Sequence, residues 1–533
     1  GVPSVMPEYP ETLCLDIPEN VNPRRIEFET LQGIVNRDGP HLFLGRKEDR
    51  WMETYVRDYG IRPRSADDGQ VLAAFANRLK GLVVYDDRVD GAAYVAATLG
   101  GLDDLLPVSN TIHFRDQALF ETLGLDIVLD LRGRFADSVE AYEWALDNLM
   151  PRSSRTVAHS VLGPDIDGVK AGPWKWPGMD WAVSQRGFVF RLTCADIPME
   201  SYGYKVGGSP DQARLYKRIL EALEPNAEIT GFGEPEGHWI SMVSRAGHYA
   251  FHYGTNASFH AQVKARGTLR QSSPDGIPRA DDDSVFVCLM ASEGDTMKGP
   301  LTFYYESWNN KERGEYPLNW GINPIMATRH PAMMETLYRE ATPNDCFFAG
   351  ASGAGYAYLG DMSQEDLEAY ARHVADLSAL ADIRVFDVWE IREADLSAVT
   401  AILKPLGLTV KNRGVIPPRL PDGTPTTSFG PWLWYWQNQV TGSWSPTYKK
   451  MQDDEDRAVL LDALVKRLEE AAASREKPCI LPVYTDIHNL YNFPRIAEEL
   501  QARLPQSMVL ARLDSAFQAL RDRDEAQGIP GSE

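Results

Sequence analysis

The sequence predicts an α/β protein in two parts: an N-terminal α/β domain with a mostly parallel sheet at residues 1–200, and a C-terminal TIM-like (β/α) barrel at residues 201–533. Short apolar runs alternate with segments of helical period, which is the pattern of strands joined by helices. A chain of 533 residues is too long for one compact core. The second part holds eight or nine strand candidates, most of them followed by helices, as a (β/α) barrel requires.

The N-terminal part reads as repeated strand and helix units. An apolar run at residues 12–16 predicts a strand, and residues 22–36 predict the helix that follows it. No loop of the G-x-G-x-x-G type follows the strands, so the sequence predicts no nucleotide site there. We expect this domain to be accessory and able to cover the site of the barrel. The further strand candidates are at residues 41–45, 81–86, 125–133 and 156–163.

The C-terminal part repeats strands and helices more regularly. Helical segments at residues 362–381 and 453–473 lie between strand candidates. In a (β/α) barrel the functional side chains gather at the C-terminal ends of the strands, because the loops that follow the strands build the site. The strand candidates are at residues 228–232, 249–253, 284–290, 318–323, 346–351, 383–390, 408–412, 479–485 and 508–513.

The composition excludes several classes of partner. Hydrophobic residues make up 43% and charged residues 24%, and no apolar run is long enough to span a bilayer. A formal net charge of −22 disfavours nucleic acid and anionic membranes and suits a neutral ligand. The 13 Trp and 22 Tyr residues suit a carbohydrate, because sugar rings stack on aromatic faces. We therefore expect a carbohydrate substrate, no nucleic acid and no membrane.

The cysteines and the N-terminal residues leave the compartment open. The five cysteines have no metal or redox spacing and predict no disulfide framework. The chain opens without a basic-then-apolar signal, although a signal peptide could have been removed before Gly1. The protein could therefore be cytoplasmic or secreted. The oligomeric state is equally open, and we expect no cofactor.

Polar and aromatic side chains follow the predicted barrel strands. Carboxylates can move protons, amides can bind hydroxyl groups, and aromatic rings can stack on sugars, so this set suits a polyhydroxylated ligand. We predict that these residues meet at one rim of the barrel. The predicted substrate-binding residues are Glu236, Asn256, Trp320, Asn323, Tyr356, Tyr358, Trp389, Glu390 and His488.

A Gly-rich segment with two tyrosines follows the strand candidate at 346–351. Its glycines would allow a sharp turn that aims both tyrosines at the pocket, or the tyrosines could pack on a neighbouring helix. The segment "SGAGYAYL" (352–359) resembles the signature of the GxGYxYP family of proposed glycoside hydrolases, with Leu359 in place of the final proline. Residues 28–44 resemble the N-terminal signature of that family. The chain is thus identified as a divergent member of that family, and the resemblance implies carbohydrate hydrolysis.

Three carboxylates are the predicted catalytic residues: Glu293, Asp295 and Asp486. Glu293 and Asp295 lie two residues apart, so in an extended backbone they point the same way, about 6–7 Å apart. Glycoside hydrolysis needs two carboxyl groups, one to donate a proton and one to attack or to activate water, and this spacing borders on the inverting range. Alternatively, Glu293 or Asp295 caps a helix or pairs with Lys298 or Arg329, and Asp486 forms a turn.

Two other functions remain open at this point. A metal-dependent hydrolase of the polysaccharide deacetylase type would need clustered histidines, but the ten histidines are scattered without an H-x-x-x-H pair, so we predict no metal. A non-catalytic carbohydrate-binding protein could use the same carboxylates to bind hydroxyl groups only. A serine hydrolase is disfavoured, because no G-x-S-x-G elbow follows a strand.

Overall fold

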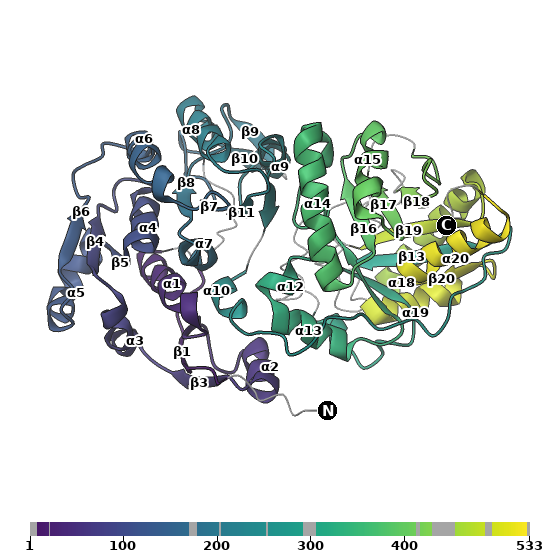
Figure 1. Ribbon diagram of the computed structural model, residues 1–533, viewed down its shortest axis with the longest axis horizontal. Coiled ribbons are helices and arrows are strands. Elements are labelled where there is room, and N and C mark those ends of the chain that lie inside the picture. Colours follow the sequence, from purple (N-terminus) through teal and green to yellow (C-terminus); the bar gives the residue numbers. More distant parts are fainter. Residues whose placement is uncertain are drawn as a thin grey trace. The chain divides into compact units, whose positions relative to one another are not determined.

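The computed structural model describes two compact units (Figure 1). The first comprises Gly1–Arg266 together with Thr328–Met333, and the second comprises Gly267–Ala327 together with Met334–Glu533. The described residues are 8–20, 22–169, 178–201, 204–251, 254–291, 305–411, 416–428, 454–485 and 493–529. No helix within these ranges has the length and apolar character needed to cross a bilayer.

The first unit is built on three sheets in which every described strand pair is parallel. A short antiparallel pair, β9 (Met199–Ser201) and β10 (Tyr204–Val206), stands apart from them. The sheet orders are β2-β1-β3, β5-β4-β6 and β12-β11-β7-β8. The strands are β1 (Glu11–Leu15), β2 (Leu42–Leu44), β3 (Arg62–Ser65), β4 (Gly81–Tyr85), β5 (Leu105–Ser109), β6 (Ile127–Asp130), β7 (Val157–Val161), β8 (Phe188–Arg191), β11 (Glu228–Gly231) and β12 (Tyr249–Phe251).

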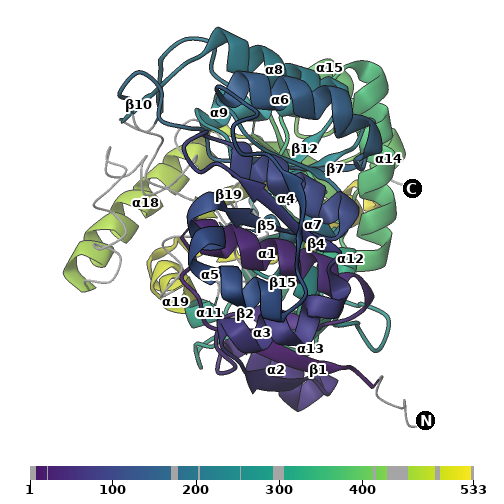
Figure 2. The same ribbon diagram turned by 90° about the vertical axis from the view of Figure 1, so that its left-hand side faces the viewer.

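Helices connect these strands, as expected for parallel sheets. In Figure 2, α4, α7 and β5 gather around α1, the first helix of the chain. The helices of this unit are α1 (Pro23–Val35), α2 (Arg50–Tyr59), α3 (Asp68–Phe75), α4 (Ala92–Asp103), α5 (Asn110–Thr122), α6 (Ser138–Asn148), α7 (Asp180–Ser184), α8 (Pro210–Glu221), α9 (Glu236–Arg245) and α10 (Ala257–His260).

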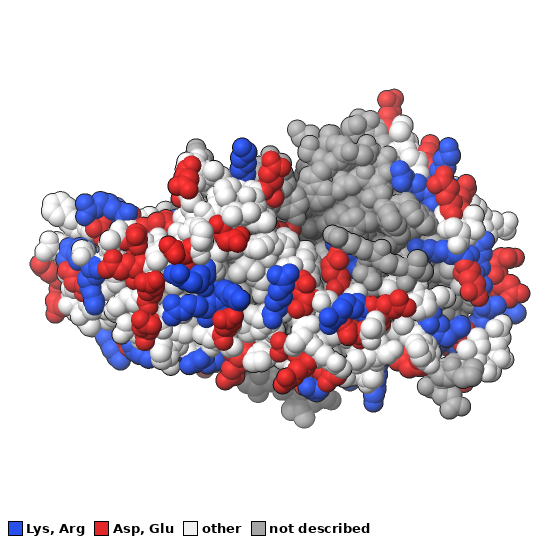
Figure 3. Space-filling view, turned by 90° about the horizontal axis from the view of Figure 1, so that it is seen from above, with Lys and Arg blue, Asp and Glu red and all other residues white. Residues whose placement is uncertain are grey.

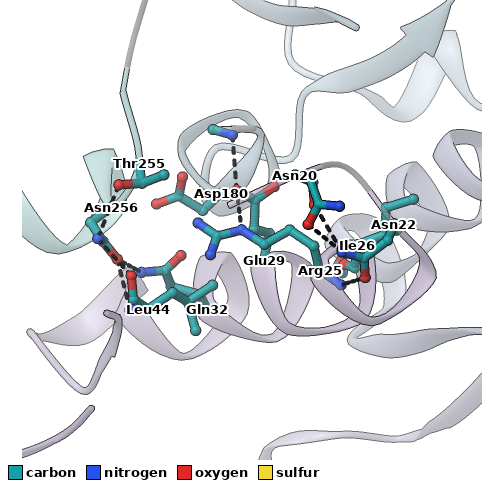
Figure 4. Close-up of polar contacts among 12 residues, drawn as sticks. Asn20, Asn22, Arg25, Ile26, Glu29, Gln32, Leu44, Asp180, Thr255 and Asn256 are labelled. Carbon is teal, nitrogen blue, oxygen red and sulfur yellow. Dashed lines mark hydrogen bonds and ion pairs between the residues drawn. The ribbon is translucent and has the colours of Figure 1, made fainter. Parts of the chain in front are cut away.

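Helix α1 is buried along almost its whole length although it is rich in polar residues. Its first turn is capped by Asn22, whose side-chain oxygen accepts the backbone N–H of Arg25 at 2.9 Å. Further along, Arg25 Nε donates to Glu29 Oε1 at 3.2 Å, and Gln32 Nε2 donates to Asn256 Oδ1 at 2.6 Å (Figure 4). The first of these bonds lies within the helix, and the second ties α1 to the residue that precedes α10.

The second unit is a parallel barrel. The strand order is β18-β17-β16-β15-β14-β13-β19, and β20 pairs with the first half of β13. Two side chains bridge the ends of this order: Thr427 Oγ1 donates to Ile480 O at 2.7 Å, and Arg475 Nη2 donates to Ser428 O at 2.7 Å. The strands are β13 (Val285–Ala291), β14 (Leu318–Ile322), β15 (Asp345–Ala349), β16 (Val385–Trp389), β17 (Gly407–Lys411), β18 (Thr426–Ser428), β19 (Cys479–Thr485) and β20 (Met508–Leu510).

Helices surround this barrel. Helices α14 and α15 lie side by side next to β16 and β17 in Figure 1. The helices are α11 (Tyr305–Trp308), α12 (Met326–Arg329), α13 (Pro331–Glu340), α14 (Gln364–Ala381), α15 (Glu393–Leu403), α18 (Asp454–Ser474), α19 (Phe493–Arg503) and α20 (Leu513–Ala526).

The predicted fold class is confirmed: an N-terminal α/β part with parallel sheets precedes a nearly closed parallel barrel. The assignment of two strands was wrong. Strands β11 and β12, which we expected in the barrel, belong to the first unit, where β11 pairs with β7. Side chains reinforce that pairing, since the hydroxyl of Thr230 on β11 lies 2.7 Å from His159 Nδ1 on β7.

Candidate functional site

The C-terminal ends of parallel strands lie at one rim of the barrel, and several of the predicted residues stand there. Asn323 follows β14, the Gly-rich segment follows β15, and Trp389 is the last residue of β16 with Glu390 directly after it. Glu293, Asp295, Asp486 and His488 lie outside the described residues. The described part of the rim therefore runs along β14, β15, β16 and β17, and includes the ends of β13 and β19.

The segment after β15 has an unusual backbone. Ala351, Ser352 and Gly353 have φ values of 51°, 80° and 106°, so three consecutive residues are in the left-handed region. Such a conformation costs about 1–2 kcal/mol at each residue that has a Cβ atom. Gly353 is required here, because an added Cβ would lie 2.8 Å from the side chain of Val374. Strain of this kind is retained where the surrounding structure enforces it, and it concentrates at functional sites.

Hydrogen bonds from two neighbouring elements hold this strained segment. Asn323 Nδ2 donates to the carbonyl oxygens of Gly350 and Gly353 at 3.0 and 2.9 Å. The hydroxyl of Tyr370 on α14 donates to Ser352 O at 2.9 Å. Burial raises the pKa of Tyr370, so its hydroxyl keeps its proton and stays a donor. Asn323 thus lies at the rim, and its amide supports the segment.

A row of four aromatic rings begins in this segment and crosses the barrel. The ring centroids of Tyr358 and Tyr356 are 5.7 Å apart, those of Tyr356 and Trp389 are 5.4 Å apart, and those of Trp389 and Tyr484 are 5.9 Å apart. Tyr484 belongs to β19, which is not a neighbour of β16 in the sheet. Trp389 and Tyr484 therefore meet inside the barrel, beneath its mouth.

The rings of this aromatic row differ in exposure. Trp389 and Tyr356 are 2% and 5% exposed, whereas Tyr358 is about half-buried. Neighbouring rings meet edge to face, at 71° between Tyr358 and Tyr356 and at 78° between Tyr356 and Trp389, which is a favourable arrangement for aromatic pairs. Tyr358 is thus the ring with accessible surface, and the others support it from below.

Two residues that the sequence reasoning did not select complete this arrangement. Lys411, the last residue of β17, places its ammonium 4.3 Å from the centre of the Trp389 ring, and Tyr484 extends the row. Both lie in strands that were predicted correctly. Strand alternation could have selected Tyr484, because it shares the inward face with alternate residues of β19. Glu390 is half-buried with a φ of 52°, and its carbonyl oxygen accepts the N–H of Gly360 at 2.7 Å.

Trp320 does not lie at the rim. Its side chain is fully buried, its indole N–H donates to Asp345 Oδ1 at 2.9 Å, and its ring packs against Trp308 of α11 and Phe493 of α19. A residue that contacts the outer helices points away from the barrel interior. The structure thus places Trp320 in the layer between strands and helices.

Two further predicted residues belong to the first unit. Asn256, which precedes α10, has a φ of 66°, and its side-chain oxygen accepts the N–H of Leu44 at 2.8 Å (Figure 4). Glu236 is the first residue of α9 and is half-buried. Both residues follow strands of the first unit and not barrel strands, because β11 pairs with β7, and β12 pairs with β11.

The electrostatic surroundings set limits on ligand chemistry. On the face shown in Figure 3, acidic and basic side chains of the described residues are interspersed, without the one-sided basic stripe of a nucleic-acid interface. Within the described ranges, no group of three or more His, Cys, Asp and Glu side chains is arranged to hold a metal ion. The absence of a metal from the mechanism stays a prediction.

Two segments of the chain match domain models of one family. Residues 283–416, which include β13 to β17, match the profile described as "GxGYxYP putative glycoside hydrolase C-terminal domain". Residues 79–153 match the profile described as "GxGYxYP_N second domain". The chain contains two GxGYxYP-family domains. The resemblance carried by "SGAGYAYL" is thereby confirmed, and the aromatic row begins within the matched C-terminal domain.

A solved structure shares the fold of this chain. It is titled "Crystal structure of a putative hydrolase from Bacteroides thetaiotaomicron VPI-5482 at 1.25 A resolution", with a TM-score of 0.75 and 15% identity over 96% of this chain and 95% of that chain. A second, titled "Crystal structure of putative polysaccharide deacetylase from Mycobacterium smegmatis", has 10% identity over 48% of this chain and 96% of that chain. Its TM-score of 0.34 is too low to show a shared fold. No curated protein matches this chain in sequence.

Proposed function

We propose that this GxGYxYP protein is a glycoside hydrolase whose site is the mouth of the barrel. The observation that supports this most directly is the aromatic row from Tyr358 to Tyr484, which starts from a strained segment at the C-terminal end of a barrel strand. An aromatic surface at a barrel mouth suits the apolar face of a sugar ring. The description of the matched C-terminal domain agrees with this activity. In this proposal the barrel is catalytic and the first unit is accessory.

The pairing of β13 with β19 supports the proposed catalytic carboxylates. Ala291 and Thr485, the last residues of these two strands, are register partners. Neighbouring strands lie about 4.8 Å apart, so the chain leaves the rim at adjacent points on its way to Glu293 and to Asp486. In this proposal one of Glu293 and Asp486 donates a proton to the leaving oxygen, while the other activates water or attacks the sugar.

The substrate-binding roles follow from the described geometry and from the sequence. Tyr358 would stack on a sugar ring, with Tyr356 and Trp389 beneath it. Glu390, at the end of β16, and His488, which follows β19 in sequence, would bind hydroxyl groups. Asp295 is the alternative partner of Glu293 in catalysis.

The test is a panel of neutral oligosaccharides and polysaccharides incubated with the full-length protein, with and without a chelator. Glu293→Gln, Asp295→Asn and Asp486→Asn are compared with Glu365→Gln, which changes an exposed glutamate on α14. We expect hydrolysis that survives the chelator and falls at least about 10³-fold in two of the three variants, while sugar binding is retained.

Other outcomes would favour the alternative functions. Sugar binding without turnover in the unaltered protein would indicate a non-catalytic carbohydrate-binding protein. Activity that is lost with the chelator and restored by added metal would indicate a metal-dependent hydrolase of the deacetylase type. Either result would overturn the proposed two-carboxylate mechanism.

A further inference from the structure

A buried carboxylate lies inside the barrel directly below the aromatic row. Asp387 is fully buried on β16, and its Oδ2 accepts the indole N–H of Trp389 at 2.8 Å. Its Oδ1 accepts the hydroxyl of Thr409 on β17 at 2.8 Å. Asp387 and Thr409 are register partners, and Trp389 lies two residues further along the same strand. Residues two apart in a strand share one face, so Asp387 and Trp389 both point into the barrel.

The backbone of Trp389 is held from a second direction. Ser352, in the strained segment, accepts the backbone N–H of Trp389 through its Oγ at 2.8 Å. The backbone N–H of Ser352 in turn donates to Asp387 O at 2.8 Å. The indole ring and the main chain of Trp389 are therefore fixed by separate hydrogen bonds, and the main-chain bond is made by Ser352, the first residue of the segment "SGAGYAYL".

Burying the Asp387 carboxylate is unfavourable, and a residue that only fills space would not need it. A buried carboxylate loses its hydration and is tolerated only when hydrogen bonds replace it. Apolar side chains of similar volume would often be equally stable or more stable at such a position. A hydrogen bond from an indole N–H to a carboxylate is charge-assisted and stronger than a neutral one, and it fixes the plane of the ring. The chain thus retains a costly group that determines how Trp389 is oriented.

The orientation of Trp389 determines the positions of the rings above it. Tyr356 contacts the Trp389 ring at 78°, and Tyr358 contacts Tyr356 at 71° with a separation of 3.3 Å between the two hydroxyl oxygens. A rotation of the indole would remove the surface on which Tyr356 rests. Tyr358, the ring with accessible surface, would then lose its support.

We propose that Asp387 is a positioning residue, which acts through Trp389 and Tyr356 to hold the Tyr358 ring where a sugar stacks on it. This inference rests on the proposed function, because it assigns the aromatic row to sugar binding. Asp387 itself contacts no sugar in this scheme.

The first measurement tests the positioning without any need for activity. The indole N–H resonance of Trp389 is identified in the NMR spectrum of the full-length protein by its loss in Trp389→Phe. We expect this resonance to shift upfield in Asp387→Leu, less in Asp387→Asn, which keeps an acceptor oxygen, and hardly at all in Glu365→Gln. Thr409→Val, which removes the second partner of the carboxylate, should also shift it, and Thr409→Ser should restore it.

The second measurement tests the consequence for the sugar. With an oligosaccharide that the unaltered protein cleaves, Asp387→Leu should raise KM about tenfold or more and change kcat much less, because only binding is lost. In the Trp389→Phe background the same substitution should have little further effect, since the two residues act as one unit. If Asp387→Leu does not fold, the isosteric variants Asp387→Asn and Thr409→Val replace it in this measurement.

The outcomes separate this inference from the proposed function. An unchanged Trp389 resonance in Asp387→Leu would overturn the positioning role even if the protein is a glycosidase. So would a double variant in which the changes in KM caused by the Asp387 and Trp389 substitutions simply multiply. A fall in kcat with unchanged KM would overturn it as well. If the unaltered protein binds sugar without cleaving it, the proposed hydrolysis fails, while the NMR shifts and the loss of sugar affinity still support the positioning role.

Discussion

The burial of Glu27 on α1 predicts how the free energy of unfolding depends on pH. Its side chain is fully buried, and neither carboxylate oxygen has a hydrogen-bond partner among the described residues. The neighbouring cation is Arg24, whose Nη1 lies 3.6 Å from Glu27 Oε2 and whose guanidinium also faces Asp68 and Asp116. Burial therefore raises the pKa of Glu27 from 4.5 to about 8, and Arg24 offsets this only in part. The other nearby titratable groups are Arg115 and Tyr85.

The sign and size of the effect follow from linkage between protonation and folding. The unfolded chain releases this proton near pH 4.5, whereas the folded chain keeps it up to about pH 8. The contribution of Glu27 to stability is therefore complete below pH 4.5 and is lost as the pH rises through about 8. Each pH unit between the two values corresponds to about 1.4 kcal/mol, so the loss is about 5 kcal/mol.

Glu27→Gln tests this directly, because glutamine is neutral at every pH and has nearly the same shape. We expect the variant and the unaltered protein to be similarly stable at about pH 4.5, and the variant to be about 5 kcal/mol more stable at about pH 9, measured by urea unfolding. Glu53→Gln, which changes an exposed glutamate on α2, is the control and should show no such change. A stability difference between Glu27→Gln and the unaltered protein that stays constant across this range would refute the reasoning.

Three further predictions concern other parts of the chain. Lys404 is an exposed C-cap of α15 with a φ of 47°, so Lys404→Gly should stabilise the protein by about 1 kcal/mol in urea unfolding. Asp382→Gly, at the C-cap of α14, should stabilise it less, because the Asp382 carboxylate accepts the N–H of Gln271 at 2.9 Å and this bond would be lost. Tyr370→Phe removes the hydroxyl that holds Ser352 and should lower stability by about 1–2 kcal/mol and raise KM for the sugar, with unchanged KM as the contrary result. The five cysteines are buried, and burial raises the pKa of Cys14 and Cys194 to about 12. Thiol reagents should therefore react slowly with the native protein at neutral pH and quickly once denaturant is added, and fast reaction of the native protein would contradict this.

The alternation of apolar runs and helical segments was sufficient to predict the elements of the barrel. The run at residues 284–290 is β13 (Val285–Ala291), and the run at 479–485 is β19 with the same limits. These strands are buried on both faces, so their apolar runs are continuous and easy to recognise. Because β14 is also buried on both faces, the sequence did not show which way Trp320 points. In a strand with two buried faces, the sequence does not distinguish a side chain that points into the barrel from one that packs against the outer helices.

Sheet membership could not be predicted from local sequence for a different reason. Strand β11 is short, as several barrel strands are, and only its pairing with β7, about 70 positions earlier in the chain, places it in the first unit. Contacts over such separations depend on packing between whole elements. Glu236 and Asn256 were assigned to the barrel rim because the strands before them were, so one error of pairing attached two residues of the first unit to barrel strands.

Two unfavourable features coincide at the barrel mouth, as expected of a functional site. Left-handed conformations at Ala351 and Ser352 cost about 1–2 kcal/mol each, and burying the carboxylate of Asp387 also costs stability. They are joined directly, because Ser352 N–H donates to Asp387 O and both residues bind Trp389. Local rules of stability are usually broken where function requires it. A chain selected for stability alone would relax the strained segment and replace the carboxylate, and it would then lose the ring geometry that these features together maintain.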